Sequence, residues 1–325
     1  MGKKVLTICI PTYNRKERLL NQLESLYAQV DVYKIVIEII NNHSDYDVEG
    51  AIRDHFGVER IKNLRVHNNP VNLGLEPNIC MPFLVTQTKW LWTLGDDDET
   101  MPNSISVVLD SINKYNTSSS IIFSISNFPS HDNYVCKELD SFIDYWYSGN
   151  RKNGDLVFLS NKVYNMDYAR PYVGLAFKNC LNCVGHLVPI FQCLNDGKGE
   201  VRFCSSSIVT YKEPDANTGW AYIKVALEFS LISYLELNLS ERSFKHLCAS
   251  FGRSFNSISF INECLNYYPR YKGKFIFYEV YNKLLRYKSF GSRCSKIIFI
   301  ICYCLHINYN RAIPFMRNVW HKFSK

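Results

Sequence analysis

The chain has 325 residues, of which 47% are hydrophobic and 14% aromatic, and its formal net charge is +7. This composition excludes a largely disordered chain and allows one large hydrophobic core or two smaller ones. No apolar run reaches the roughly 18 residues that a bilayer-spanning helix needs. The short VLTICI run near the N-terminus does not match a secretory signal. We therefore expect a cytosolic protein.

The first 125 residues alternate apolar runs with amphipathic segments. Strands are predicted at 5–10, 34–40, 64–67, 89–94 and 120–125, where the runs are short and apolar. Helices are predicted at 15–29, 48–56, 76–84 and from Pro102 to Tyr115. This alternation predicts an α/β fold with a mostly parallel sheet and helices on both faces. Between about 126 and 217 the pattern weakens, and short strands are predicted there at 156–159 and 208–211.

Three polar segments each follow a predicted strand. They are PTYNR after the first strand, NNHSD after the second and GDDDE after the strand at 89–94. Ligands of open parallel sheets bind at the carboxyl ends of the strands. We therefore expect the three segments to meet in one crevice.

The aspartate cluster Asp96, Asp97 and Asp98 is the strongest candidate for chemistry. Adjacent carboxylates repel one another, so a folded protein keeps them where water or a cation neutralises them. Asp96 and Asp98 can lie on the same side of an extended turn and bind Mg²⁺ or Mn²⁺, which then stabilises a diphosphate leaving group. The alternative is a solvated acidic turn before the helix at Pro102.

The segments TICIPTYNRKERL, IEIINNHSDYD, NNPVNLGLEPN and WLWTLGDDDE occur in this order over residues 4–125. In this order and spacing they resemble the nucleotide-sugar-binding half of the family-2-type glycosyltransferases with the GT-A fold. The likeness is greatest to the bacterial enzymes that build O-antigen and capsular repeat units. The resemblance implies a nucleotide-sugar donor, with a UDP-sugar as the first expectation, and a lipid-linked oligosaccharide acceptor.

The resemblance also implies roles for single residues. Asp96 is expected to face the ribose, with Asp97 beside the nucleotide, and Asp98 is expected to hold the metal at the diphosphate. Asn41 or Asn42 stands where the family has an aspartate that contacts the base, and an amide both donates and accepts hydrogen bonds. The other residues expected to contact the nucleotide are Pro11, Thr12, Tyr13, Asn72 and Gly74.

An inverting transfer needs a base that takes the proton of the acceptor hydroxyl. His186 lies 90 residues beyond Asp96, about where the family has its base, and imidazole titrates near neutral pH. Asp196 and Glu200 are the rival candidates, and a buried structural histidine is the alternative role for His186.

Twelve cysteines occur without a secretory context, so free thiols are expected. Cys180, Cys183 and His186 are spaced by three residues, with Cys193 beyond them. A zinc site uses such ligands, but this spacing matches no common zinc pattern. A cysteine-rich buried helix face is the preferred interpretation.

The C-terminal part is basic and predicted to be helical. Residues 270–325 carry twelve Lys and Arg and one acid, a net charge of +11, which leaves 7 − 11 = −4 on the rest. Helices are predicted from Trp220 onward and at 243–266, 273–288, 294–306 and 311–323. Basic and aromatic residues interleaved with the apolar IIFIICYCL block favour a membrane surface as the partner. Nucleic-acid binding and an inert basic tail are the alternatives, and nucleic acid is not expected.

The sequence thus predicts two regions and one preferred function. Residues 1–217 are expected to form the GT-A catalytic domain, and residues 218–325 a helical region peripheral to the inner face of the plasma membrane. The expected activity is inverting, metal-dependent glycosyl transfer. A non-catalytic nucleotide-sugar or polysaccharide binding module is the main alternative, and a nucleotidyl- or phosphotransferase is another. The chain has neither a GxxxxGK[ST] loop nor a GxGxxG fingerprint, which weakens kinase-like and dinucleotide-binding alternatives.

Overall fold

The computed structural model describes residues 4–126, 132–149, 153–182, 184–211, 222–253, 257–267, 269–287 and 291–304. The chain divides into two compact units. The first contains Met1–Phe142 and Asp155–Asn217, and the second contains Ile143–Gly154 and Thr218–Lys325. Residues 143–154 therefore group with the C-terminal helices, whereas the sequence analysis assigned all of 1–217 to one domain.

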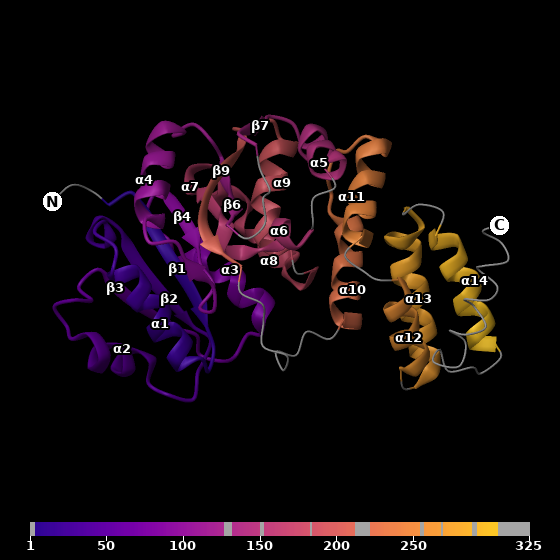
Figure 1. Cartoon of the computed structure of the whole chain (residues 1–325), viewed down its shortest axis with the longest axis horizontal. Helices are drawn as coiled ribbons and strands as arrows, with labels where there is room; N and C mark the ends of the chain where they lie inside the picture. The colour runs from indigo at the N-terminus through magenta and orange to yellow at the C-terminus, as the bar shows by residue number, and fades with distance from the viewer. Residues whose placement is uncertain are drawn as a thin grey trace. The chain divides into compact units, whose positions relative to one another are not determined.

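The first unit is built on one sheet with the strand order β3-β2-β1-β4-β8-β6-β9-β5, and β7 pairs with β9. Figure 1 shows β1 to β3 in indigo at one side of this sheet and β6 and β9 at the other. The strands are β1 (Leu6–Thr12), β2 (Val36–Asn41), β3 (Leu64–Asn68), β4 (Trp90–Thr93), β5 (Glu99–Thr100), β6 (Ser120–Ile125), β7 (Tyr134–Cys136), β8 (Lys162–Asn165) and β9 (Val201–Thr210).

Most of the central strands are parallel. β1 pairs in parallel with β2 and β4, β2 with β3, and β6 with β9. β8 is antiparallel to both of its neighbours, β4 and β6. The prediction of a mostly parallel sheet is confirmed, and β8 is the interruption that the alternating pattern did not reveal.

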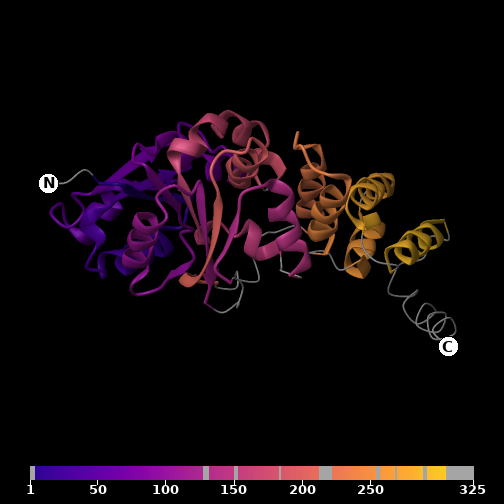
Figure 2. The same cartoon turned by 90° about the horizontal axis from the view of Figure 1, so that it is seen from above.

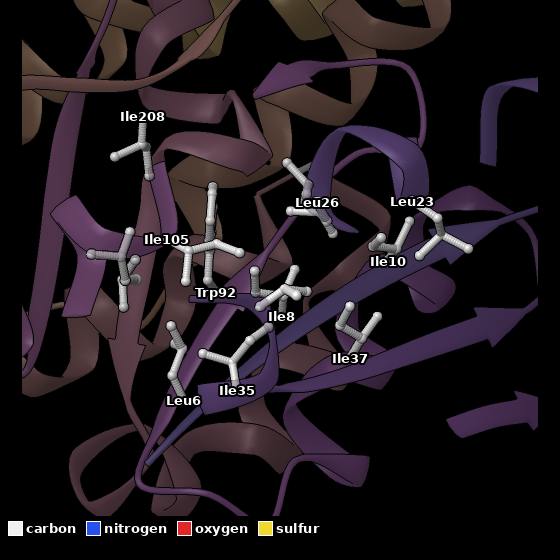
Figure 3. Close-up of a cluster of buried hydrophobic side chains, with 14 of the residues drawn as sticks. Leu6, Ile8, Ile10, Leu23, Leu26, Ile35, Ile37, Trp92, Ile105 and Ile208 are labelled. Atoms are coloured by element: carbon white, nitrogen blue, oxygen red, sulfur yellow. The ribbon is translucent and has the colours of Figure 1, made fainter. Parts of the chain in front are cut away.

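Helices cover both faces of the sheet, as predicted. α1 (Lys16–Tyr27), α2 (Val48–Phe56) and α4 (Ser104–Lys114) contribute to the buried cluster that also contains Ile8, Ile37 and Trp92. Figure 3 shows the part of this cluster that comes from the strands, α1 and α4. α3 (Leu75–Val85) covers the opposite face, where Phe83 meets Tyr164 edge to face at 4.9 Å. Each fully buried aliphatic side chain contributes about 1.5–3 kcal/mol.

Short helices follow β7 in the weakly patterned region at 126–217. They are α5 (Leu139–Ser148), α6 (Asn153–Val157), α7 (Met166–Ala169), α8 (Val173–Lys178) and α9 (Val188–Asn195). The predicted strand at 156–159 is wrong, because that run lies in α6 and the turn before β8. A short apolar run fits a buried helix as well as a strand, so its hydrophobicity did not decide between them. The predicted strand at 208–211 is the end of the longer β9.

Single helical turns connect several of these elements. The turns are η1 (Val32–Lys34), η2 (Leu159–Asn161), η3 (Arg170–Tyr172), η4 (Cys180–Asn182), η5 (Gly185–Leu187), η6 (Leu231–Tyr234) and η7 (Leu285–Tyr287). The candidate base His186 lies in η5, and Ser160, which contacts Asp98, lies in η2.

From residue 222 onward the second unit consists of helices and helical turns, coloured orange to yellow in Figure 2, and the described residues 235–240 between them are not helical. Its helices are α10 (Tyr222–Ser230), α11 (Glu241–Arg253), α12 (Ser257–Asn266), α13 (Arg270–Lys283) and α14 (Gly291–Cys304). The segment predicted as one helix at 243–266 contains two, α11 and α12. The ring of Phe277 stacks on that of Phe299 with centroids 3.8 Å apart, which joins α13 to α14. The predicted helix at 311–323 lies outside the described residues.

None of the helices in the described part of the chain combines the length and the hydropathy needed to cross a bilayer.

Candidate active site

The parallel strands bring the predicted polar segments to one edge of the sheet. Thr12 at the end of β1 is level with Asn41 at the end of β2, and Cys9 is level with Thr93 at the end of β4. Beyond these ends the backbone N–H of Asn14 donates to Ser44 Oγ at 2.9 Å, which joins the first two segments. Thr12 and Arg15 of the first segment also contact Asp96.

Two arginines at the start of α1 neutralise the first two aspartates. Arg15 Nη1 lies 2.9 Å from Oδ1 of Asp96 and 3.0 Å from Oδ2 of Asp97. Arg18 Nη1 lies 3.2 Å from the same oxygen of Asp97. Thr12 Oγ1 donates to Oδ2 of Asp96 at 2.7 Å, so both oxygens of Asp96 are engaged. Burial raises the pKa of Asp96, and the charge and hydrogen bonds of Arg15 and Thr12 oppose that rise.

Asp98 has different surroundings from its two neighbours. Its Oδ2 accepts a hydrogen bond from Ser160 Oγ, and it forms no ion pair among the described residues. Burial raises the pKa of Asp98 to about 7, and the charges of Asp97 and Asp96 add to this rise, whereas the Ser160 bond and the more distant charge of Arg15 oppose it. The crowded negative charge is therefore least compensated at Asp98.

The carboxylate of Asp98 fits a site for Mg²⁺ or Mn²⁺. The described residues contain no group of three or more His, Cys, Asp or Glu placed to hold a metal on their own. Such ions are commonly held by one or two protein carboxylates, with water and substrate phosphates completing the shell. Asp98 offers that carboxylate, whereas Asp96 has both oxygens occupied by Thr12 and Arg15.

The two asparagines after β2 have different hydrogen-bonding roles. Asn42 donates through Nδ2 to Asn72 Oδ1 at 2.9 Å and to the carbonyl of Gly74 at 3.0 Å. Its Oδ1 accepts from Asn69 Nδ2 and from the N–H of Leu73. These four bonds use the full capacity of the amide, so Asn42 organises the turn at 72–74 and has no group left for a base. Gly74 has φ +84°, which favours glycine there.

Asn41 keeps part of its hydrogen-bonding capacity. Its Oδ1 accepts from the N–H of Ser44 at 2.9 Å, and its Nδ2 donates to Asn68 Oδ1 at 2.8 Å. One N–H and one lone pair of the amide have no partner among these contacts. Of the two asparagines, Asn41 is therefore the one that can contact a nucleotide base. Tyr13 is 42% exposed at the same edge, and Pro11 is half-buried within β1.

His186 lies in η5 and is 2% exposed. Its Nε2 is buried without a hydrogen-bond partner among the described atoms. Burial and the nearby Lys162 lower the pKa of His186 to about 3, so the imidazole is neutral near pH 7. An imidazole with so low a pKa is a weak proton acceptor, and this environment favours the structural role over the base.

Asp196 and Glu200 are not brought to the aspartates. Asp196 follows α9 and accepts from Tyr172 Oη at 2.6 Å. The carbonyl of Glu200 accepts from the N–H of Ser119 just before β6, and its carboxylate pairs with Arg202 at 2.9 Å. β6 runs in the same direction as β4, because β8 is antiparallel to both. Glu200 therefore lies at the amino-terminal edge of the sheet, opposite the edge of Asp96.

The zinc candidates include one residue outside the described part, Cys183. Cys180 and Cys193 are buried free thiols, as is Cys80, which donates to the carbonyl of Ala176. Burial raises the pKa of Cys193 to about 12, which keeps it protonated. These thiols act as small apolar side chains.

Two residues of the site were missed by the sequence analysis. Arg15 stands inside the PTYNR segment, and its charge next to a predicted acidic crevice was an available signal. Ser160 lies 62 residues from its partner Asp98. A single serine in an irregular segment carries no pattern, so its role could not be found without the structure.

The comparison with protein families gives one match. A model described as "Glycosyl transferase family 2" matches residues 7–173, just over half of the chain. Abequosyltransferase RfbV of Salmonella typhimurium strain LT2 is 29% identical over 105 residues. That match spans 32% of this chain and 31% of RfbV, so the chain aligns with under a third of that relative.

Solved structures resemble the whole chain at low identity. Staphylococcus aureus TarS (residues 1–349) has a TM-score of 0.59 at 12% identity, covering 94% of this chain and 91% of that one. Its complex with UDP-GlcNAc gives the same TM-score over 87% and 80%. Mannosyltransferase PcManGT from Pyrobaculum calidifontis, in complex with GDP-Man and Mn²⁺, gives 0.50 at 9% identity over 92% and 86%. These likenesses concern the fold, and they confirm the expected GT-A architecture.

Proposed function

Because the chain belongs to glycosyl transferase family 2 and is a glycosyltransferase, we propose that it moves a sugar from a nucleotide-diphosphate donor to a lipid-linked oligosaccharide. The transfer is inverting and metal-dependent, and the product belongs to an O-antigen or capsular polysaccharide. The similarity to an abequosyltransferase supports the O-antigen assignment. The similar structures of TarS in complex with UDP-GlcNAc and of PcManGT in complex with GDP-Man support the nucleotide-sugar donor.

The observation that carries the proposal is the uneven neutralisation of the three aspartates. Arg15 and Arg18 hold Asp97, and Arg15 and Thr12 hold Asp96, whereas Asp98 has only a hydroxyl partner among the described residues. A divalent cation bound by Asp98 would supply Lewis-acid stabilisation of the leaving diphosphate. Thr12 and Arg15 would fix Asp96 for the ribose, and the free N–H and lone pair of Asn41 would contact the base.

Turnover with a panel of nucleotide sugars tests the proposal. Purified protein is incubated with each donor, Mn²⁺ and lipid-linked acceptors, and the release of nucleoside diphosphate is measured. We expect one donor to be consumed in an acceptor-dependent reaction that excess chelator stops and added Mn²⁺ restores. The anomeric configuration of the product, read by NMR, tests inversion. Binding of a nucleotide sugar without turnover across the acceptors would instead indicate the non-catalytic binding module.

The proposal includes peripheral binding of the second unit to the inner face of the plasma membrane. On α13 and α14 the apolar side chains of Phe275, Ile297, Ile300 and Ile301 are exposed, Phe275 by 73% and Ile297 by 58%. The net charge of +11 on residues 270–325 favours anionic lipid. Exposed apolar residues on a basic helical unit are typical of an interfacial surface.

Vesicle flotation tests the membrane assignment. We expect the protein to float with anionic vesicles and less with neutral ones, and the triple variant Ile297→Ser, Ile300→Ser, Ile301→Ser to float less. The matched control replaces three exposed apolar residues of the first unit, Val30, Val58 and Leu84, by serine. Equal flotation of the two triple variants would contradict this part of the proposal.

A further inference from the structure

The segment Phe158–Lys162, which joins α6 to β8, is bound to the sheet on both sides. Trp92 of β4 donates through Nε1 to the carbonyl of Ser160 at 2.7 Å, and Thr93 Oγ1 donates to the carbonyl of Leu159 at 3.1 Å. On the other side Asn161 Nδ2 donates to the carbonyl of Phe123 in β6 at 3.1 Å. The backbone that carries Ser160 is therefore fixed between two strands.

Lys162 strengthens this arrangement from inside the protein. Its side chain is 0% exposed, and its Nζ donates to Asn161 Oδ1 at 2.7 Å, to the carbonyl of Asp155 at 3.3 Å and to that of Phe158. Burial lowers the pKa of Lys162 well below its usual value, and the charge of Asp155 opposes that shift. A buried polar group of this kind is retained only when it is hydrogen-bonded, and three acceptors surround Nζ. Because burying the lysine amine costs free energy unless it is hydrogen-bonded, these bonds indicate that Lys162 holds the segment in one defined conformation.

Ser160 Oγ links this segment to the aspartate turn by two hydrogen bonds. It accepts from the N–H of Gly95 at 2.7 Å and donates to Oδ2 of Asp98. Because a hydroxyl has a single hydrogen, the bond accepted from Gly95 leaves that hydrogen directed at Asp98. A Cβ on Gly95 would lie 2.6 Å from the same Oδ2, so glycine at 95 lets the carboxylate fold back to this position.

We propose that Ser160 is a positioning residue for Asp98: it ties down Oδ2 and leaves Oδ1 to bind the divalent cation. The inference rests on the proposed metal-dependent function and adds a residue to it. The anchored segment orients the carboxylate before the cation and the donor arrive, which removes the cost of ordering it at that moment.

Mn²⁺ binding without turnover tests this role directly. Free Mn²⁺ is measured by its electron paramagnetic resonance signal as protein is titrated with Mn²⁺, alone and with UDP present. For Ser160→Ala we expect about 10–100-fold weaker Mn²⁺ binding, the usual effect of removing a partner of a metal ligand. Ser160→Cys keeps the size of the side chain but donates weakly, and it should show the same loss if the hydrogen bond is the cause.

Ser118→Ala is the matched control, because Ser118 is also fully buried but lies at the opposite edge of the sheet beside Glu200. It should bind Mn²⁺ as the wild type does. Thermal unfolding identifies any variant that does not fold. If Ser160→Ala does not fold, Ser160→Cys provides the binding measurement. In turnover assays, the Mn²⁺ concentration for half-maximal rate should rise 10–100-fold for Ser160→Ala, while the donor KM at saturating Mn²⁺ stays within about threefold.

The outcomes separate the inference from the function on which it rests. Wild-type affinity for Mn²⁺ in folded Ser160→Ala or Ser160→Cys would overturn the role of Ser160 and leave the metal role of Asp98 intact. No Mn²⁺ binding by the wild type, with or without UDP, would overturn the metal role and this inference together.

Discussion

Each edge of the central sheet has an acid that accepts a hydrogen bond from a serine, but only one of the two acids is also paired with an arginine. At the amino-terminal edge the carboxylate of Glu200 is paired with Arg202 at 2.9 Å and accepts from Ser118 Oγ. At the carboxyl edge Asp98 also accepts from a serine, Ser160, but has no cationic side chain in ion-pair contact among the described residues. A buried carboxylate without a cationic partner is costly, and proteins keep such groups mainly at functional sites.

The difference indicates how to tell a structural acid from a functional one in this molecule. Sequence position alone ranked Glu200 among the candidate bases, yet its charge is satisfied within the protein. Asp98 is the acid whose charge still needs a partner. The following predictions test this contrast between the two edges.

Asp98→Asn gives the largest expected effect. The amide keeps the size of the side chain and can still accept from Ser160, but it removes the negative charge that would hold the cation. Since metal stabilisation of a leaving group is worth several kcal/mol, we expect a fall in kcat/KM of roughly 1,000-fold or more. Steady-state release of nucleoside diphosphate measures it, with circular dichroism as the control for folding. Near-normal turnover would show that Asp98 holds no essential ion.

Arg15→Ala is expected to lower kcat/KM by about 10–100-fold. Arg15 bridges Asp96 and Asp97, so its loss leaves Asp96 with Thr12 as partner and lets burial raise the pKa of Asp96 further. The matched variant is Arg18→Ala, because Arg18 contacts Asp97 but not Asp96 in the ion pairs described. Arg18→Ala should lower kcat/KM by less than about threefold. Equal losses in the two variants would argue that only net charge matters at this edge.

Glu38→Gln tests another acid, which is buried in the middle of β2 and away from both edges. Burial raises the pKa of Glu38 to about 7 from 4.5, and Arg65 opposes this rise. The folded chain thus binds a proton that the unfolded chain releases between these values, so the Glu38 contribution to stability falls as pH rises from about 4.5 to 7. Above that window the glutamine variant should be more stable than the wild type by the order of 1–3 kcal/mol.

Urea unfolding at pH 5 and pH 8 measures the effect of Glu38→Gln. The advantage of the variant should be larger at pH 8 than at pH 5. The same advantage at both values would mean that Glu38 does not titrate in this range in the folded protein.

Glu200→Gln gives the smallest expected effect, and it makes the same chemical change as Asp98→Asn at the other edge. Loss of the pair with Arg202 should cost about 1 kcal/mol or less of stability. Activity should stay within about twofold of the wild type, because Glu200 lies away from Asp98. Thermal unfolding and the turnover assay measure the two quantities, and a large loss of activity in a stable variant would restore Glu200 as a candidate base.

The sequence predicted the half of the fold in which local pattern and tertiary structure agree. β1, β2, β4 and β6 are short apolar runs, and α1 and α4 have their apolar residues on one stripe, so periodicity was sufficient there. The segment at 156–162 could not be predicted in this way. Its conformation depends on Lys162 and Asn161 donating to carbonyls and side chains that the sequence does not place near them.

The sequence likewise predicted only part of the candidate site. The aspartates and the segment at Thr12 were found because each directly follows a predicted strand. The different partners of the three aspartates could not be predicted, since they depend on contacts of Arg15 and Ser160 with residues 62 or more positions away. From the sequence, Asn41 and Asn42 were equal candidates for contact with the base, and only the four hydrogen bonds of Asn42 distinguish them.

The place of β8 in the sheet bears on how the chain folds during synthesis. β8 fills the gap between β4 and β6, yet it leaves the ribosome after both of them. Until residue 165 has emerged, the edges of β4 and β6 have no neighbour there, and contacts over such long separations form slowly. A nascent chain stopped before residue 160 would contain all three aspartates but not the hydroxyl that we propose orients the third. On this proposal the aspartate turn is completed only when β8 joins the sheet, and β9 is the one strand of the described sheet that is made later.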